Sequence, residues 1–134
     1  MPRLLWAMAL FATAATAACH KDAGPGGVRL KQVHDGLNSA GFKTDDFKKT
    51  DSSHFSAQNC EAGALSGLDT VICEFGSPEA VMLGKKAGEA WVAQATTGVV
   101  LANGNTLLYL ADRGKADPNG QTIHKITKAY SGIH

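Results

Sequence analysis

Apolar residues recur every three to four positions in three parts of the chain, and this period predicts three helices. The first covers about 28–40 and ends at Gly41, because glycine readily adopts the left-handed conformation that closes a helix. The second begins at Ser77-Pro78-Glu79, where a capping hydroxyl precedes proline and an acid, and continues to about residue 94. The third begins after Asp117-Pro118. The side chains predicted to face inward on the second helix are Ala80, Leu83, Ala87, Ala90 and Trp91.

Residues 54–75 are expected to form a β-hairpin, because apolar and polar side chains alternate along them. A two-residue loop at Ser66-Gly67 would place Cys60 directly opposite Cys73. Counted outward from that loop, this is a non-hydrogen-bonded pair, whose Cα atoms approach to about 4.5 Å, close enough for a disulfide. Turn, face polarity and cysteine position agree, so the sequence predicts a Cys60–Cys73 disulfide. The same register places on the opposite face Asn59, Glu61 and Glu74.

Residues 96–110 predict a second hairpin, because Asn103-Gly104 is a strong signal for a two-residue turn. This turn would pair Val99 with Leu108 and Thr97 with Leu110. Both faces of the hairpin are apolar, so we expect it to lie centrally in the sheet or to meet a partner. One face carries Val99, Leu101, Leu108 and Leu110, and the other carries Val100, Leu107 and Tyr109.

The predicted order of elements is α-β-β-α-β-β-α, which is an α+β fold. We expect a four-stranded antiparallel sheet with helices on one face. The polar stretch 43–52 is expected to be a loop, with a short strand around Phe47 as the alternative. Helices on one side leave one face of the second hairpin uncovered, and exposed apolar faces often mark interaction sites. The pattern does not decide which face is the uncovered one, and the candidate face for an envelope protein partner or for self-association is Val100, Leu107 and Tyr109.

The first 18 residues predict a secretory signal peptide. Arg3 precedes an apolar run over residues 4–11, and Ala and Thr follow. This run is shorter than the roughly 20 apolar residues that a membrane-spanning helix needs.

Two cleavage sites fit the end of this leader. Ala15-Thr16-Ala17 fits ordinary signal peptidase, with cleavage before Ala18. Thr16-Ala17-Ala18-Cys19 resembles the lipobox of bacterial lipoprotein precursors, with threonine where that family prefers leucine. The resemblance implies that Cys19 becomes the first mature residue and carries acyl chains such as palmitate. It also implies anchoring in the outer membrane, since His20 stands where the family uses aspartate to retain proteins at the inner membrane.

The cysteine count favours lipidation over plain secretion. The chain has three cysteines, and an odd number in an exported protein leaves one thiol to explain. If Cys60 pairs with Cys73, the remaining one is Cys19, where the lipobox requires it.

Three parts of the chain follow from these observations: a signal peptide over 1–18, a lipidated flexible tether over 19–27, and a single α+β domain over 28–134. The chain has 13 basic and 12 acidic residues. Removal of Arg3 with the leader leaves 12 basic residues (13 − 1) against 12 acidic ones, a formal charge of zero. This balance argues against a nucleic-acid partner, and the membrane is expected to be met through the lipid anchor.

Motifs that carry chemistry are missing from the sequence. It contains no nucleophile elbow, P-loop or dinucleotide-binding glycine pattern, and its five histidines lack metal-ligand spacing. We therefore expect no cofactor and no metal site.

The sequence predicts a lipid-anchored cell-envelope protein that faces the periplasm or the cell surface and acts as a non-catalytic binding or accessory domain. One alternative is a small exported enzyme whose site assembles only in three dimensions. Its candidate residues are His34, His54, Asp112 and His124. Another alternative is a structural subunit that docks through the second hairpin.

Overall fold

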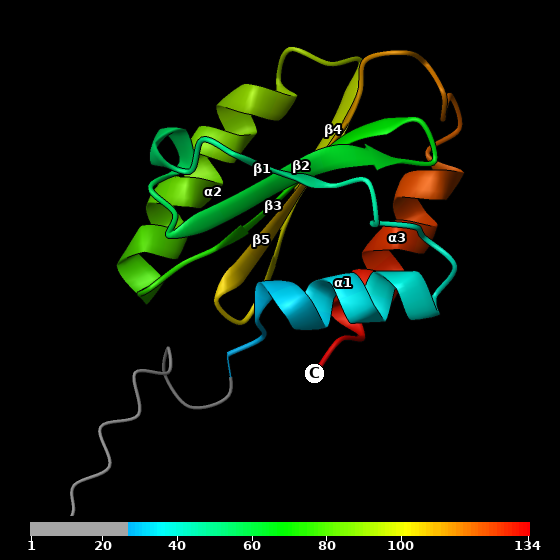
Figure 1. Cartoon of the computed structure of the whole chain (residues 1–134). Helices are drawn as coiled ribbons and strands as arrows, with labels where there is room; N and C mark the ends of the chain where they lie inside the picture. Colours follow the sequence, from blue (N-terminus) through cyan, green and yellow to red (C-terminus); the bar gives the residue numbers. More distant parts are fainter. Residues whose placement is uncertain (1–26) are drawn as a thin grey trace, which may run out of the picture.

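A computed structural model of the chain describes residues 27–134 (Figure 1). The predicted leader, the lipobox with Cys19 and the tether up to residue 26 lie outside the described residues. The elements are, in chain order, α1 (Leu30–Ser39), β1 (Lys48–Thr50), the one-turn 3-10 helix η1 (Ser53–Phe55), β2 (Asn59–Leu65), β3 (Leu68–Glu74), α2 (Pro78–Val92), β4 (Thr97–Asn103), β5 (Thr106–Asp112) and α3 (Gln121–Ser131).

The strands form one antiparallel sheet in the order β1-β2-β3-β5-β4. This confirms the predicted α+β class and the antiparallel sheet. The sheet has five strands where four were predicted, because Lys48–Thr50 pairs with β2. Its edges are therefore the short β1 and the longer β4.

Helices cover both faces of the sheet (Figure 1), and the prediction that they share one face is wrong. Because both faces of the central strands are apolar, each needs a helical cover. The core under α1 and α3 contains Val33, Leu37, Leu65, Leu68, Ile72, Leu108, Leu110, Ile123, Ile126 and Tyr130. The core under α2 contains Phe55, Cys60, Val71, Cys73, Phe75, Leu107 and Tyr109.

The predicted interaction face of the second hairpin is accordingly not an open surface. Leu107 and Tyr109 are fully buried, and Val100 is half-buried beside them. All three belong to the core that α2 covers. The prediction assumed an uncovered side of the sheet, which α2 occupies.

The first hairpin has the predicted register. Ser66 and Gly67 form its turn, and both have positive φ (50° and 85°), as a type I′ turn requires. Cys60 pairs with Cys73 at a Cα–Cα distance of 4.2 Å, and the two form a disulfide. Both half-cystines are buried.

The second hairpin turns one residue later than predicted. Asn103 pairs with Thr106, so the turn residues are Gly104 and Asn105, and only Gly104 has positive φ, as in a type II′ turn. Val99 consequently faces Leu110 and not Leu108. The shift moves each pairing by two positions, so every side chain keeps its predicted face.

The inner face of α2 matches the predicted stripe in part: Ala80, Ala87 and Trp91 pack against the core, whereas Ala90 is exposed. Gly84 and Gly88 are buried against the sheet, whereas Leu83 is 58% exposed. The aromatic rings of Phe75 and Tyr109 fill the space beneath the helix, which leaves room only for glycine.

Candidate functional site

A groove of about 780 Å³ lies between α1 and α3. We call it the α1–α3 groove. Its buried and half-buried lining is apolar and comprises Gly36, Phe42, Ala129 and Ile133. Its exposed lining comprises Gln32, Asp35, Ser39, Ala40, Lys125, Lys128, Gly132 and His134. An apolar floor with a few polar groups around it is the usual composition of a binding site.

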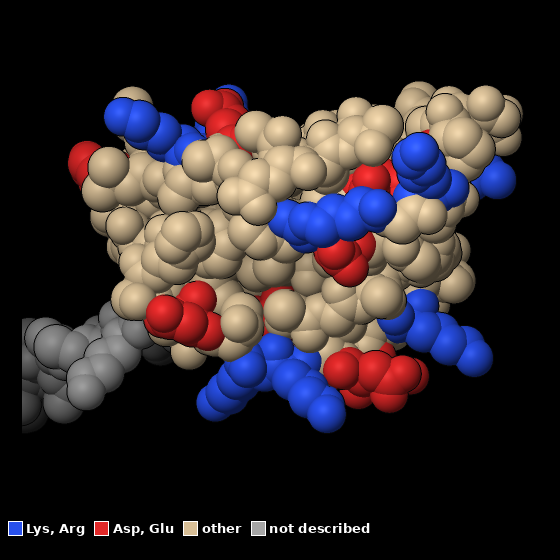
Figure 2. Space-filling view, turned by 90° about the horizontal axis from the view of Figure 1, so that it is seen from above, with Lys and Arg blue, Asp and Glu red and all other residues tan. Residues whose placement is uncertain are grey.

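The charges at the groove are unbalanced. Asp35 on the α1 side is paired with Lys31, one helical turn away, at 2.6 Å. Lys125 and Lys128 on the α3 side form no ion pair within residues 27–134. Two uncompensated ammonium groups therefore border the apolar floor. Elsewhere, on the face shown in Figure 2, basic and acidic side chains lie interspersed.

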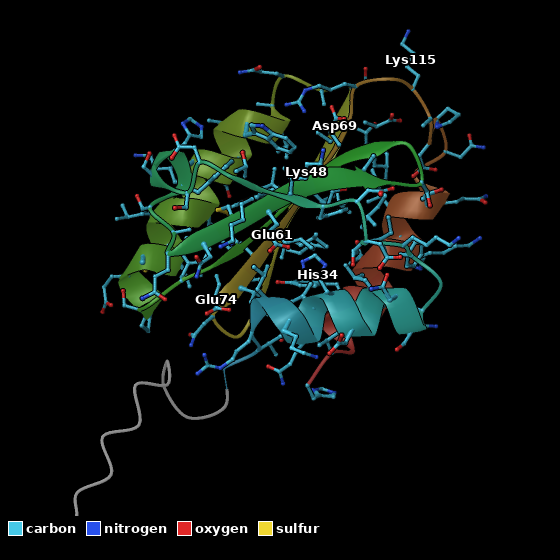
Figure 3. The ribbon with its side chains drawn as sticks, viewed as in Figure 1. His34, Lys48, Glu61, Asp69, Glu74 and Lys115 are labelled. Carbon is cyan, nitrogen blue, oxygen red and sulfur yellow. A yellow bond between two sulfur atoms is a disulfide. The ribbon has the colours of Figure 1, made fainter. Side chains whose placement is uncertain are left out.

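A carboxylate of the sheet fixes the first turn of α1. Glu74 on β3 accepts a hydrogen bond from the backbone N–H of Leu30 at 2.8 Å. A carboxylate suits this place, because the first N–H groups of a helix lack partners and carry partial positive charge. The start of α1 is thereby tied to the end of the central strand β3 (Figure 3).

A second polar contact holds the middle of α1. Nε2 of His34 lies 2.5 Å from Oε2 of Glu61 on β2 (Figure 3). Its Nδ1 lies 2.7 Å from Oγ1 of Thr44. The ring of Phe47 meets the imidazole edge-on, at a centroid distance of 5.6 Å. Asn38, one turn along α1, holds Thr44 through its side-chain amide. The network therefore joins helix, loop and strand.

The hydroxyl of Thr44, the imidazole of His34 and the carboxylate of Glu61 are linked in the order found in a catalytic triad, but the hydroxyl is not accessible to a substrate. Thr44 is 4% exposed, and its hydroxyl already bonds both His34 and the amide of Asn38. A hollow of about 290 Å³ beside Glu61 is lined by neither Thr44 nor His34. A substrate carbonyl would have no path to the hydroxyl, so we assign the network to positioning α1.

The other wall of the groove is held by Tyr130 and Asn103. The hydroxyl of Thr106 donates to the Asn103 carbonyl, so the Tyr130 phenol is the donor in its 2.8 Å bond to Thr106. Burial raises the pKa of the Tyr130 phenol, which keeps that donor neutral. The Asn103 amide donates to the carbonyls of Tyr130 and Ile133, both at 2.9 Å. Both groove walls are thus fixed by polar bonds to the sheet.

The candidate catalytic residues from the sequence do not converge. His34 contacts Thr44 and Glu61, as described above. His54 is exposed on η1 and packs edge-on against its neighbour Phe55. The carboxylate of Asp112 accepts the backbone N–H groups of residues 116 and 117 and orders that loop. His124 is exposed on α3.

Sequence analysis missed the groove and the role of Glu61. A signal for Glu61 was present, since strand alternation placed it with Glu74 on one face of the first hairpin. The groove had no such signal, because it depends on how α1 and α3 lie relative to each other.

Residues 27–134 contain no group of three or more His, Cys, Asp or Glu side chains that could hold a metal ion. No helix of this part of the chain is long and apolar enough to cross a membrane. The chain matches no protein-family model, and no curated protein or solved structure shows significant similarity to it.

Proposed function

We propose that this chain is a non-catalytic, lipid-anchored protein of the bacterial cell envelope, whose domain binds an extended acidic segment of a partner protein in the α1–α3 groove. The observation that carries the proposal is the pairing of an apolar floor with two uncompensated lysines, Lys125 and Lys128. Apolar side chains of such a segment would fill the floor, and its carboxylates would meet the lysines. Both walls are held by hydrogen bonds to the sheet, so the groove would lose little conformational entropy when a segment binds.

Export of the domain is supported by its disulfide. Cys60 and Cys73 are bonded and buried, and structural disulfides persist in oxidising compartments such as the periplasm. With that bridge formed, Cys19 is the remaining cysteine of the chain, at the lipobox-like position. One acyl-bearing residue at the end of a short polar tether would hold the domain near the membrane surface.

The groove is tested with peptides of defined charge. A labelled peptide of alternating Leu and Glu should bind and shift the amide resonances of Gly36 and Ala129 on the two walls. The same peptide with Lys in place of Glu should bind at least about tenfold more weakly, and added salt should weaken the acidic peptide.

Charge reversal supplies the matched variants. Lys125→Glu with Lys128→Glu should abolish binding of the acidic peptide. Lys85→Glu with Lys86→Glu, an exposed pair on α2, changes the net charge equally and should leave binding intact. Equal loss in both double variants, or resonance shifts away from the groove, would show that the groove is not the binding site.

The anchor is tested separately. Cys19→Ala should move the protein from the membrane fraction to the soluble periplasmic fraction and remove the mass of the acyl chains. If the variant fractionates with the membrane at unchanged mass, Cys19 is not lipidated.

A further inference from the structure

The two edges of the sheet differ in how they are protected. β1 has three residues, Lys48, Lys49 and Thr50, and a short edge strand with lysines resists pairing with another strand. β4 has seven residues, Thr97–Asn103, without charge or proline. Residues 90–111, which include all of β4 and its partner up to residue 111, contain no charged side chain. This edge therefore lacks the usual features that prevent strand addition.

The outward backbone groups of β4 are unpaired. The backbone N–H of Phe75, just after β3, donates to the Asn105 carbonyl, just before β5, at 2.8 Å. In an antiparallel sheet the backbone groups of successive residues point to opposite neighbours, so odd-numbered residues of β5 bond β3 and even-numbered residues bond β4. On β4, Gly98, Val100 and Ala102 pair with odd positions, so their N–H and C=O groups point away from the sheet. Within residues 27–134 no hydrogen bond engages these groups.

The side chains of the edge are apolar and only partly covered. Val99 and Leu101 are half-buried on the α1–α3 side, and Val100 is half-buried on the α2 side. Every residue of the neighbouring β5 is buried. A long, uncharged and apolar edge of this kind is a template for another strand.

We propose that β4 pairs antiparallel with β4 of a second copy of this chain and joins the two five-stranded sheets into one. With Val100 at the two-fold axis, Val100 faces Val100 of the second copy and Gly98 faces Ala102 of the second copy. These residues carry the free backbone groups, and each such pair exchanges two N–H···O bonds. Val99 then lies opposite Leu101 of the second copy, at the closer non-hydrogen-bonded spacing.

The edge suits its own copy for two reasons. The strand is neutral throughout, so a two-fold pairing brings no like charges together. Its apolar residues are centred on Val100, so the same register satisfies both copies, as an isologous interface requires. A two-fold axis perpendicular to the sheet also keeps each face on its own side, and no residue of β4 lines the α1–α3 groove. The pairing is therefore independent of the proposed groove function.

Hydrogen exchange tests the pairing residue by residue. We use residues 19–134 with Cys19→Ala, which contain every residue of both cores. The protein is concentrated from micromolar to about 1 mM, because anchoring to a common membrane can raise the effective concentration of two copies to the millimolar range. Over this range the amides of Gly98, Val100 and Ala102 should gain protection from exchange. Those of Val99 and Leu101 already bond β5 and should change little.

A matched pair of substitutions completes the test. Ala102→Lys places a charge on the free edge, and Ala64→Lys makes the same change at an exposed position of β2. Sedimentation should show at least a tenfold weaker dimer for Ala102→Lys and an unchanged dimer for Ala64→Lys, with circular dichroism confirming that both fold. A protein that stays monomeric at 1 mM, a dimer whose edge amides exchange freely, or an Ala102→Lys variant that dimerises normally would each overturn the proposal.

Discussion

Gly88 marks a very close approach of α2 to the sheet, and its replacement by alanine should destabilise the domain. A Cβ atom at Gly88 would lie 2.0 Å from Cε1 and 2.3 Å from Cδ1 of Tyr109, far inside normal contact. The Tyr109 ring has little freedom to move, because it stacks on Phe55 at 4.7 Å and its hydroxyl donates to the Gly84 carbonyl at 2.9 Å. The helix must therefore shift if the methyl group is to fit.

One stabilising and two destabilising effects set the magnitude. Alanine is favoured over glycine inside a helix by about 1 kcal/mol. Overpacking of a rigid core costs about 1–3 kcal/mol, and loss of the Tyr109–Gly84 hydrogen bond costs about 1 kcal/mol more. We expect Gly88→Ala to lower the free energy of unfolding by about 1–3 kcal/mol.

Urea unfolding of residues 19–134 measures the change, with the fluorescence of Trp91, the one tryptophan in this part of the chain, as reporter. Ala90→Gly, at an exposed position of α2, is the control for helix propensity alone and should cost about 1 kcal/mol.

A double-mutant cycle isolates the steric cause. Tyr109→Val removes the ring atoms that a Cβ at Gly88 would meet. In that background Gly88→Ala should stabilise, by about 1 kcal/mol, because only the helix preference remains. If Gly88→Ala stabilises the unmodified protein, or costs the same in both backgrounds, the close-packing argument is refuted.

Two further predictions concern covalent and electrostatic ties. Mass spectrometry after alkylation without reduction should show Cys60 and Cys73 unmodified, and alkylation before reduction would contradict the bridge. The double variant Cys60→Ala with Cys73→Ala should lower the free energy of unfolding by about 3 kcal/mol, the value of the chain-entropy model for a separation of 13 residues. Burial raises the pKa of the Asp117 carboxyl, but the backbone N–H groups of Ile123 and Thr122 outweigh it and hold this pKa below its usual value. This carboxylate therefore contributes stability above the unfolded pKa of about 3.9, and the contribution is lost as pH falls through the lower folded pKa. Asp117→Asn should flatten the pH dependence of the urea midpoint below about pH 5, and an unchanged slope there would refute the assignment.

The two hairpins show which parts of the fold the sequence determines locally. Ser66-Gly67 was predicted correctly because turn type, disulfide spacing and face polarity are all properties of one short segment. The turn at Asn103-Gly104 was misplaced because the Asn103 amide is engaged by two carbonyls at the end of α3. That contact joins residues about 30 positions apart, and no local pattern reveals it.

The predicted inner face of α2 was partly wrong for a related reason. Hydrophobicity favoured Leu83 as an inward residue, whereas packing selected Gly84 and Gly88, because Phe75 and Tyr109 already fill the space below. The side of the sheet that a helix covers depends on its long-range partners, and the sequence showed only that both faces were apolar. The α1–α3 groove was unpredictable on the same grounds, although the residues that hold its walls were visible as polar positions on strands.

The strand order also has a consequence for how the chain folds. β2–β3 and β4–β5 are joined by two-residue turns, so each hairpin can form from neighbouring residues within about 1–10 μs. The β3–β5 seam is different, because about 30 residues including α2 separate its strands. Its contacts, such as Ile72 opposite Leu108, join the two hairpins and form only after the long connection between β3 and β5 has closed. We expect closure of this seam to limit the folding rate, so substitutions along it, and at the turns that form before it, should slow folding.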